Sequence, residues 1–177
     1  MPNWVTNVIH ALNDDVDFEK FTDEEGKFDF NKIIRMPDDI FKGNLGEEER
    51  RMYGEKNWYD WSIEHWGTKW NARESNVQGN TVYFETAWSC PLPVLRELGK
   101  KVGGILVFYA DEDTGSNCGG FIVKKNGDII ELDNDRIMAV AIQGDDLYDH
   151  DIVDRFIWDV ECEEDDWEDI LLDALQG

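Results

Sequence analysis

The residues best suited to a binding role are carboxylates, and they gather near the C-terminus. Between Gly144 and Asp173 lie fourteen Asp or Glu and one basic residue, Arg155, which gives this segment a local charge of −13. Apolar residues recur among the acids at the spacing of helices that have one packed face. A folded acidic face would hold negative charges at fixed positions, as a nucleic acid backbone does. This pattern therefore predicts a surface that binds something basic.

The predicted acidic helices span residues 151–161 and 164–175. We predict that the partner-binding acidic face consists of these residues: Asp145, Asp146, Asp149, Asp154, Asp159, Glu161, Glu163, Glu164, Asp165, Asp166, Glu168 and Asp169. Clustered like charges oppose folding, and salt screens them only beyond a Debye length of about 8 Å. Selection for a basic partner would explain why the chain tolerates that repulsion. The alternative is a solvated face that only covers the sheet and confers solubility.

A second group of residues combines aromatic rings with a cation. Trp58, Trp61, Trp66 and Trp70 fall within thirteen residues, and Lys69 lies among them. Such residues can stack on a base and pair with its phosphate, which makes the block a candidate second patch. Indole rings are also large apolar groups that commonly anchor a core. Of these two interpretations, the sequence favours the structural one.

The sequence contains part of a calcium-binding pattern but no complete metal site. Asp111, Asp113, Gly115 and Asn117 resemble the first half of a calcium loop, yet Ile122 stands where the bidentate Glu is needed. A polar turn between two strands accounts for the same residues. The three histidines are isolated from any Cys or His at zinc-ligand spacing: His10, His65 and His150. We therefore predict no metal and no cofactor.

Catalytic motifs are also missing from the sequence. It has no G-x-S-x-G, phosphate loop, H-E-x-x-H or dinucleotide fingerprint. Cys90, at the predicted start of a helix, could form a nucleophile–base pair only if the fold brought His65 to it. A pair of otherwise isolated residues is weak support for an enzyme. We therefore predict a non-enzymatic protein without catalytic residues.

Composition restricts the class of protein further. The chain has 177 residues, of which 41% are hydrophobic and 12% aromatic, enough for one domain of ordinary size. The formal net charge of −23 would repel DNA, RNA and anionic lipids, so no direct nucleic acid binding is expected. No run of eighteen apolar residues and no secretory signal occurs, which predicts a cytoplasmic protein with no membrane span. Three widely spaced cysteines argue against a disulfide framework: Cys90, Cys118 and Cys162.

In the first half of the chain, few elements have a clear period. Residues 4–12 alternate as a strand, and residues 16–21 can form a short helix with Asn13 or Asp14 as its N-cap. Residues 28–66 lose periodicity and form a predicted aromatic-rich insertion, in which residues 28–37 are expected to be extended. Residues 46–53 are expected to form an exposed helical turn or two.

The secondary-structure signals are clearer from residue 68 onward. Residues 68–77 and 81–88 form a predicted hairpin, in which Trp88 shares a face with Val82, Phe84 and Thr86. A helix follows from the Ser89–Pro93 region and ends at the glycine pair 103–104. Its predicted buried stripe consists of Val94, Leu95, Leu98 and Val102. Strands at 105–110, 120–123 and 128–132 complete the pattern. The order predicts an α+β fold with helices on one face of an antiparallel sheet.

Several blocks of sequence resemble a known family. They are residues 1–4, residues 30–37, the Trp-Gly-Thr-Lys-Trp block at 66–70 with its flanks, and residues 84–93. In these blocks the chain resembles the YubB-like proteins of phages and conjugative plasmids, over about residues 1–125. The resemblance implies a ferredoxin-like domain and a mobile-element origin, but no activity.

These observations combine into one hypothesis. We predict a ferredoxin-like domain at residues 1–132 with an insertion at about 28–66, and an acidic, mainly helical extension at 133–177 packed on it. The expected function is inhibition of a host defence nuclease, a CRISPR effector or restriction enzyme, whose basic channel receives the acidic face inside the host cell. A further contact is expected from Arg35, Arg50, Arg51 and the tryptophan block. The alternatives are a module that binds a nucleotide-like ligand at that block, and an acidic structural protein without mimicry.

Overall fold

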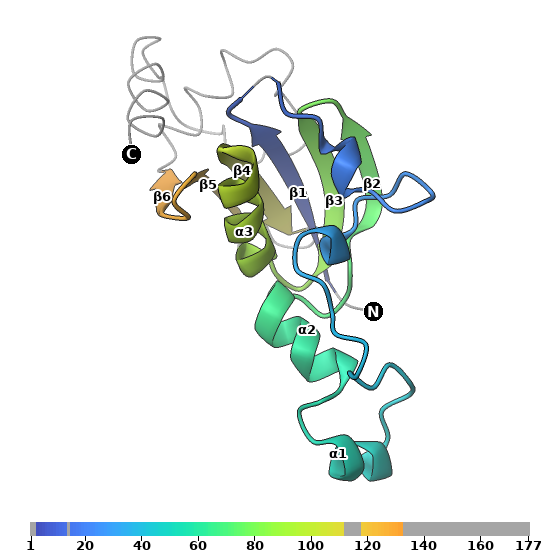
Figure 1. Ribbon diagram of the computed structural model, residues 1–177. Coiled ribbons are helices and arrows are strands. Elements are labelled where there is room, and N and C mark those ends of the chain that lie inside the picture. The colour runs from blue at the N-terminus through green and yellow to red at the C-terminus, as the bar shows by residue number, and fades with distance from the viewer. Residues whose placement is uncertain (1–2, 14, 112–117, 133–177) are drawn as a thin grey trace.

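The centre of the molecule is an antiparallel sheet (Figure 1). The computed structural model describes residues 3–13, 15–111 and 118–132. Within these residues the sheet has six strands in the order β2-β3-β1-β4-β5-β6. Their bounds are β1 Trp4–Ala11, β2 Arg73–Gln78, β3 Thr81–Ala87, β4 Gly104–Asp111, β5 Cys118–Lys124 and β6 Ile129–Leu132. The predicted antiparallel α+β architecture is confirmed.

Strand β1 is central because it pairs with both β3 and β4. Its side chains alternate between the two faces of the sheet, as the period of the sequence predicts. Ile9 belongs to the larger apolar cluster on one face, whereas Val8 belongs to a smaller cluster on the other. The smaller cluster also contains Leu106, Phe108, Ala110, Ile122 and Leu132. Both faces of the sheet are thus apolar near the middle.

The helix α3, Leu92–Val102, packs on β4 and β5 through its predicted buried stripe. Gly99 permits this close packing, because a Cβ there would lie 2.6 Å from Cγ1 of Val123. The helix ends at Gly103, whose φ of 90° is left-handed and therefore favours glycine. The sequence-based prediction of this helix is confirmed at both its stripe and its end.

Aromatic side chains from the first third of the chain cover the rest of the same face. Phe28 lies 5.2 Å from Phe84 of β3 between ring centroids, and Phe30 lies 5.7 Å from Trp66. Trp66 closes α2, Trp58–Trp66, and its indole Nε1 donates to the backbone oxygen of Ile34 at 2.9 Å. Much of the predicted insertion therefore contributes to the core, while α1, Glu47–Tyr53, has no buried residue.

Two local predictions for the N-terminal half are wrong, and a third, the short helix at 16–21, is wrong only in its helix type, its start and its N-cap. The short helix is a 3₁₀ turn over Phe18–Phe21, and its N-cap is Asp17, whose side chain accepts from the Glu19 backbone N–H. Residues 28–37 are not extended, since a second 3₁₀ turn covers Phe30–Lys32 and is capped by Asp29. In both places an aspartate offers the backbone a local hydrogen bond, which overrides the pattern of apolar residues. Strand β2 begins at Arg73, not at residue 68.

The end of β3 also departs from the prediction. The strand stops at Ala87, and the next residue, Trp88, has a left-handed φ of 72°. Alternation along a strand would place Trp88 with Val82 and Phe84 on the core face. Instead Trp88 is 45% exposed. The turn of the backbone redirects this large ring to the surface.

Candidate functional site: an aromatic and cationic surface

Aromatic rings and cations from five parts of the chain meet at one end of the sheet. We call this group the aromatic–cation surface and define it by six residues: Trp4, Tyr59, Lys69, Trp70, Arg73 and Trp88. They come from the start of β1, the first turn of α2, the segment after α2, the start of β2 and the end of β3. The surface is thus assembled by the tertiary structure.

Lys69 is the centre of the aromatic–cation surface. Its ammonium nitrogen lies 4.2 Å from the ring centroid of Trp70, 5.1 Å from that of Trp88 and 5.8 Å from that of Tyr59. A cation at these distances is attracted by the negative face of each ring. The three rings therefore hold the lysine in place and are in turn oriented by it.

A second cation extends the surface onto the edge strand β2. The guanidinium carbon of Arg73 lies 4.3 Å from the ring centroid of Trp4, and Trp4 lies 5.9 Å from Trp70. Arg73 also forms ion pairs with Glu74 at 3.4 Å and with Glu85 at 3.9 Å. Rings and charges thus alternate along the surface.

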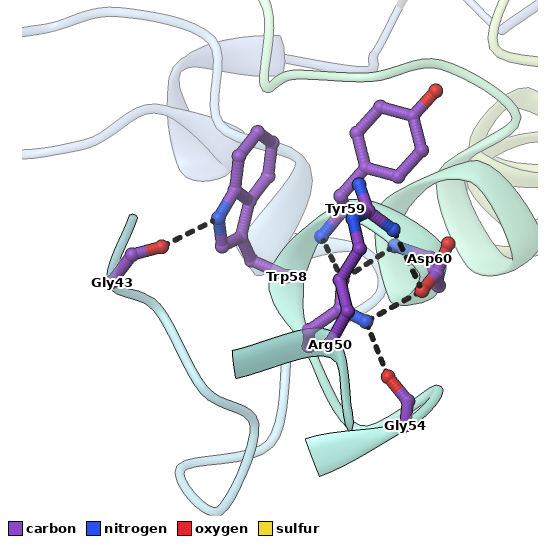
Figure 2. A network of polar contacts seen from close by, with 7 residues as sticks. Gly43, Arg50, Gly54, Trp58, Tyr59 and Asp60 are labelled. Carbon is purple, nitrogen blue, oxygen red and sulfur yellow. Dashed lines mark hydrogen bonds and ion pairs between the residues drawn. The ribbon is translucent and has the colours of Figure 1, made fainter. Parts of the chain in front are cut away.

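Figure 2 shows polar contacts around the first turn of α2, which carries Tyr59. The side-chain oxygen of Asn57 accepts from the backbone N–H groups of Tyr59 and Asp60, which caps the helix. Arg50 of α1 lies over the Tyr59 ring at 5.4 Å and pairs with Asp60 at 3.8 Å. These contacts tie α1 to α2 and set the position of the Tyr59 ring.

A cavity of about 670 Å³ opens between Tyr59 and Trp88. Its other lining residues are Ile63, which is 41% exposed, and three acids: Glu55, Asp60 and Glu64. Aromatic faces next to carboxylates attract cations by two independent effects, the ring quadrupole and the full negative charge. Because Arg50 already pairs with Asp60, Glu55 and Glu64 are the carboxylates by which this cavity can attract a basic side chain.

The turn that exposes Trp88 is held by hydrogen bonds on both sides. The Trp88 backbone N–H donates to the Asn3 oxygen at 2.9 Å. The hydroxyl groups of Thr68 and Ser89 donate to the oxygens of Ala87 and Gly67 at 2.8 and 2.6 Å. A left-handed tryptophan costs on the order of 1 kcal/mol or more, so the surrounding bonds must offset that strain. Nothing in the local sequence signals this conformation.

The structure divides the predicted tryptophan patch. Trp61 and Trp66 are 7% and 4% exposed and belong to the core, as the structural interpretation predicts. Trp58 is half-buried, and its indole Nε1 donates to the Gly43 oxygen at 3.0 Å (Figure 2). Trp70, 36% exposed, and Lys69 lie on the surface. Tyr59 belongs to the aromatic block that the sequence indicates, whereas sequence reasoning missed the contributions of Trp4 and Trp88.

The two residues considered for catalysis have separate structural roles. The His65 ring stacks on Trp61 with centroids 4.4 Å apart, and its Nδ1 lies 3.0 Å from the Trp61 oxygen. Cys90 packs against the core, and burial raises the pKa of its thiol. A thiol with a raised pKa stays protonated near neutral pH and is a poor nucleophile. Nothing in this geometry makes the two residues a nucleophile–base pair.

Other sites that were predicted from the sequence lie partly or wholly outside the described residues. This holds for all twelve acids of the predicted acidic face, 145–169, and for the rest of the calcium-like loop after Asp111. Among the residues that the structure describes, no group of three or more His, Cys, Asp or Glu is arranged to hold a metal ion. In the same residues, no helix is both long and apolar enough to cross a membrane.

The strand order, with helices on one face, defines the class as a ferredoxin-like α+β domain. A family model described as "Ferredoxin-like domain in Api92-like protein" matches residues 65–170, more than half of the chain. The chain belongs to this family. The matched range takes in most of the acidic C-terminal segment. Searches of curated proteins and of solved structures gave no match to the chain.

Proposed function

We propose that this protein is a non-enzymatic inhibitor of a host defence nuclease, such as a CRISPR effector or a restriction enzyme. In this proposal the acidic C-terminal segment imitates a nucleic acid and occupies the basic channel of the nuclease. The aromatic–cation surface and its cavity supply the second contact. The main support for the proposal is the cavity beside Trp88, where aromatic rings lie next to the carboxylates of Glu55 and Glu64 and could receive a basic side chain of the partner.

The distribution of charge supports a basic partner. Residues 133–177 contain sixteen acidic and two basic residues, whereas residues 1–132 contain twenty-four acidic and fifteen basic residues. Opposite charge on the partner would accelerate encounter and align the two molecules. Attraction of this kind is long in range but weak in specificity, so a defined contact must come from elsewhere.

Exposed tryptophans provide that defined contact. Trp, Tyr and Arg carry most of the binding energy at protein interfaces, where they sit at the centre of a desolvated patch. Trp70 and Trp88 are exposed, and Lys69 holds both rings in fixed orientations. Because these rings are already ordered, binding costs them little conformational entropy.

The origin and site of action are part of the proposal. The resemblance to YubB-like proteins supports a phage or plasmid source and action in the cytoplasm of the host cell. Chains encoded by such elements meet defence nucleases directly. Those nucleases bind DNA or RNA through basic channels, which are the surfaces that a clustered array of carboxylates would fill.

The test is DNA cleavage by a set of purified CRISPR effectors and restriction enzymes, with and without the full-length protein. Inhibition of at least one enzyme, weaker at high salt, is the expected result. A variant with Asp154, Asp159 and Asp166 changed to Asn and Glu163 to Gln should inhibit less. A matched variant that neutralises four acids elsewhere, Asp38, Asp39, Glu47 and Glu48, should inhibit normally. Equal loss in both variants, or no inhibition of any enzyme, would count against the proposal.

A second candidate function is binding of a nucleotide-like ligand. The observation in its favour is the Lys69 ammonium between the exposed rings of Trp70 and Trp88, which could pair with a phosphate while a ring stacks on a base. Quenching of tryptophan fluorescence by AMP or ATP, lost in Trp88→Ala, would support this candidate. If neither nucleotides nor basic proteins bind, the results would favour the remaining alternative, an acidic structural protein without mimicry.

A further inference from the structure

A separate cavity lies on the face of the sheet that α3 covers. It has a volume of about 510 Å³ and is lined by residues from α3, from the segment before it and from β4, β5 and β6. Its lining residues include Leu92 and Arg96 of α3, Phe121 of β5, and Ile129 and Glu131 of β6. A cavity of this volume falls in the range that accommodates small molecules in proteins.

The floor of this cavity is largely apolar. Phe121 lies 6.1 Å from Tyr109 between ring centroids, and Leu92, at 39% exposure, lies at the cavity. Gly119, opposite Tyr109 in the β4–β5 pairing, allows the Tyr109 ring to lie across β5. A Cβ at Gly119 would stand 2.7 Å from the Tyr109 hydroxyl oxygen. The floor can therefore receive an apolar side chain.

Two opposite charges line the same cavity from separate elements. Arg96 comes from α3, whereas Glu131 comes from β6, where it pairs in register with Phe121 and so shares its face. Neither of them forms an ion pair within 4 Å with another residue of the described chain. An arginine and a glutamate at one cavity usually satisfy each other when they are close enough. Within the part of the chain that the structure describes, both charges can therefore pair with a ligand.

The positions of these charges limit the class of ligand. A nucleotide is disfavoured, because its phosphates would meet Glu131 and, among the described lining residues, have one arginine to bind. A divalent metal is disfavoured as well, because Glu131 is the one carboxylate among those residues and a metal requires several ligands. A molecule with one carboxylate, one ammonium and an apolar group matches Arg96, Glu131 and the floor together.

We propose that this cavity binds a small zwitterion with an apolar side chain, of which a free branched-chain or aromatic amino acid is the simplest example. Its carboxylate pairs with Arg96, its ammonium group pairs with Glu131, and its side chain rests on Phe121 and Leu92. This inference is independent of the inhibitor function, because it uses none of the residues of the aromatic–cation surface.

Calorimetric titration of the full-length protein tests the assignment with L-phenylalanine and L-leucine as probes. Two analogues of phenylalanine each remove one charge: phenethylamine lacks the carboxylate, and 3-phenylpropionate lacks the ammonium group. We expect each analogue to bind at least about tenfold more weakly than L-phenylalanine, since each loses one charge-assisted pair.

Two variants test whether Arg96 pairs with the carboxylate of the ligand and Glu131 with its ammonium group. Arg96→Gln should weaken L-phenylalanine about tenfold or more and leave phenethylamine unchanged, whereas Glu131→Gln should weaken L-phenylalanine and leave 3-phenylpropionate unchanged. Both residues are exposed, so the variants should keep the native thermal unfolding temperature. Arg35→Gln, which removes an exposed guanidinium paired with Asp38, is the control.

The inference is overturned if neither amino acid binds at millimolar concentration. It is also overturned if the single-charge analogues bind as tightly as L-phenylalanine, or if Arg35→Gln weakens binding as much as Arg96→Gln does. None of these results would bear on inhibition of a nuclease, which is measured separately by DNA cleavage.

Discussion

The two pairs of tryptophans on either side of Gly67 have opposite surroundings. Trp61 and Trp66 precede it and are buried in the core, whereas Trp70 and Trp88 follow it and lie exposed around Lys69. The same residue type thus supports the fold in one region and forms the exposed aromatic–cation surface in the other. The number of tryptophans in a segment therefore says little about the role of each ring, because that role depends on whether the ring is buried.

Removal of a buried tryptophan ring should give the largest loss of stability. Trp66→Ala removes the contacts with Phe30 and Trp61 and the indole hydrogen bond to Ile34. It should lower the free energy of unfolding by about 3–5 kcal/mol, as measured by urea denaturation. A loss below about 1 kcal/mol, the size expected at a surface position, would show that Trp66 is not part of the core.

The glycine between the two regions should give the next largest effect. Gly67 has a left-handed φ of 75°, and a Cβ there would lie 2.7 Å from Cδ of Pro93. Gly67→Ala should therefore cost about 2–3 kcal/mol of unfolding free energy, from backbone strain and the steric clash together. The control is Gly79→Ala, where φ is 58° but no atom lies within 4 Å of a Cβ. That variant should lose only about 1 kcal/mol, and equal losses would show that the contact with Pro93 has no effect.

At Trp88, the cost of the left-handed backbone and the contribution of the exposed ring can be tested separately. With its φ of 72°, glycine suits this position better than any residue with a Cβ. Trp88→Gly should therefore be about 1 kcal/mol more stable than Trp88→Ala in thermal or urea unfolding. If the proposed inhibitor function holds, both variants should bind the inhibited nuclease more weakly than the native chain does. If either variant binds normally, Trp88 lies outside the interface.

Lys69 should give the smallest effect on stability. Lys69→Met keeps most of the side-chain volume but removes the charge that lies over the Trp70 and Trp88 rings. The expected loss is about 0.5–1 kcal/mol of unfolding free energy, and Lys69→Arg should recover most of it. A fall in partner binding in Lys69→Met that exceeds the loss of stability would show that the ring orientations matter for recognition. Unchanged binding would assign Lys69 a purely local role.

Local sequence patterns predicted β1 and the described elements from α3 to β6. The stripe of Val94, Leu95, Leu98 and Val102 in α3 and the alternation in β1 both depend on neighbours in sequence. Periodicity records burial directly where an element has one packed face, so these elements were predictable. The antiparallel α+β class followed from their order.

The residues of the two candidate sites come together only in the folded chain. Trp88 leaves the core face because long-range hydrogen bonds hold its backbone in a left-handed conformation, which no local pattern encodes. Arg96 and Glu131 line one cavity although thirty-five positions separate them in sequence, since the packing of α3 on the sheet brings their elements together. A binding site is a relation between distant residues, and that relation exists only once the chain has folded.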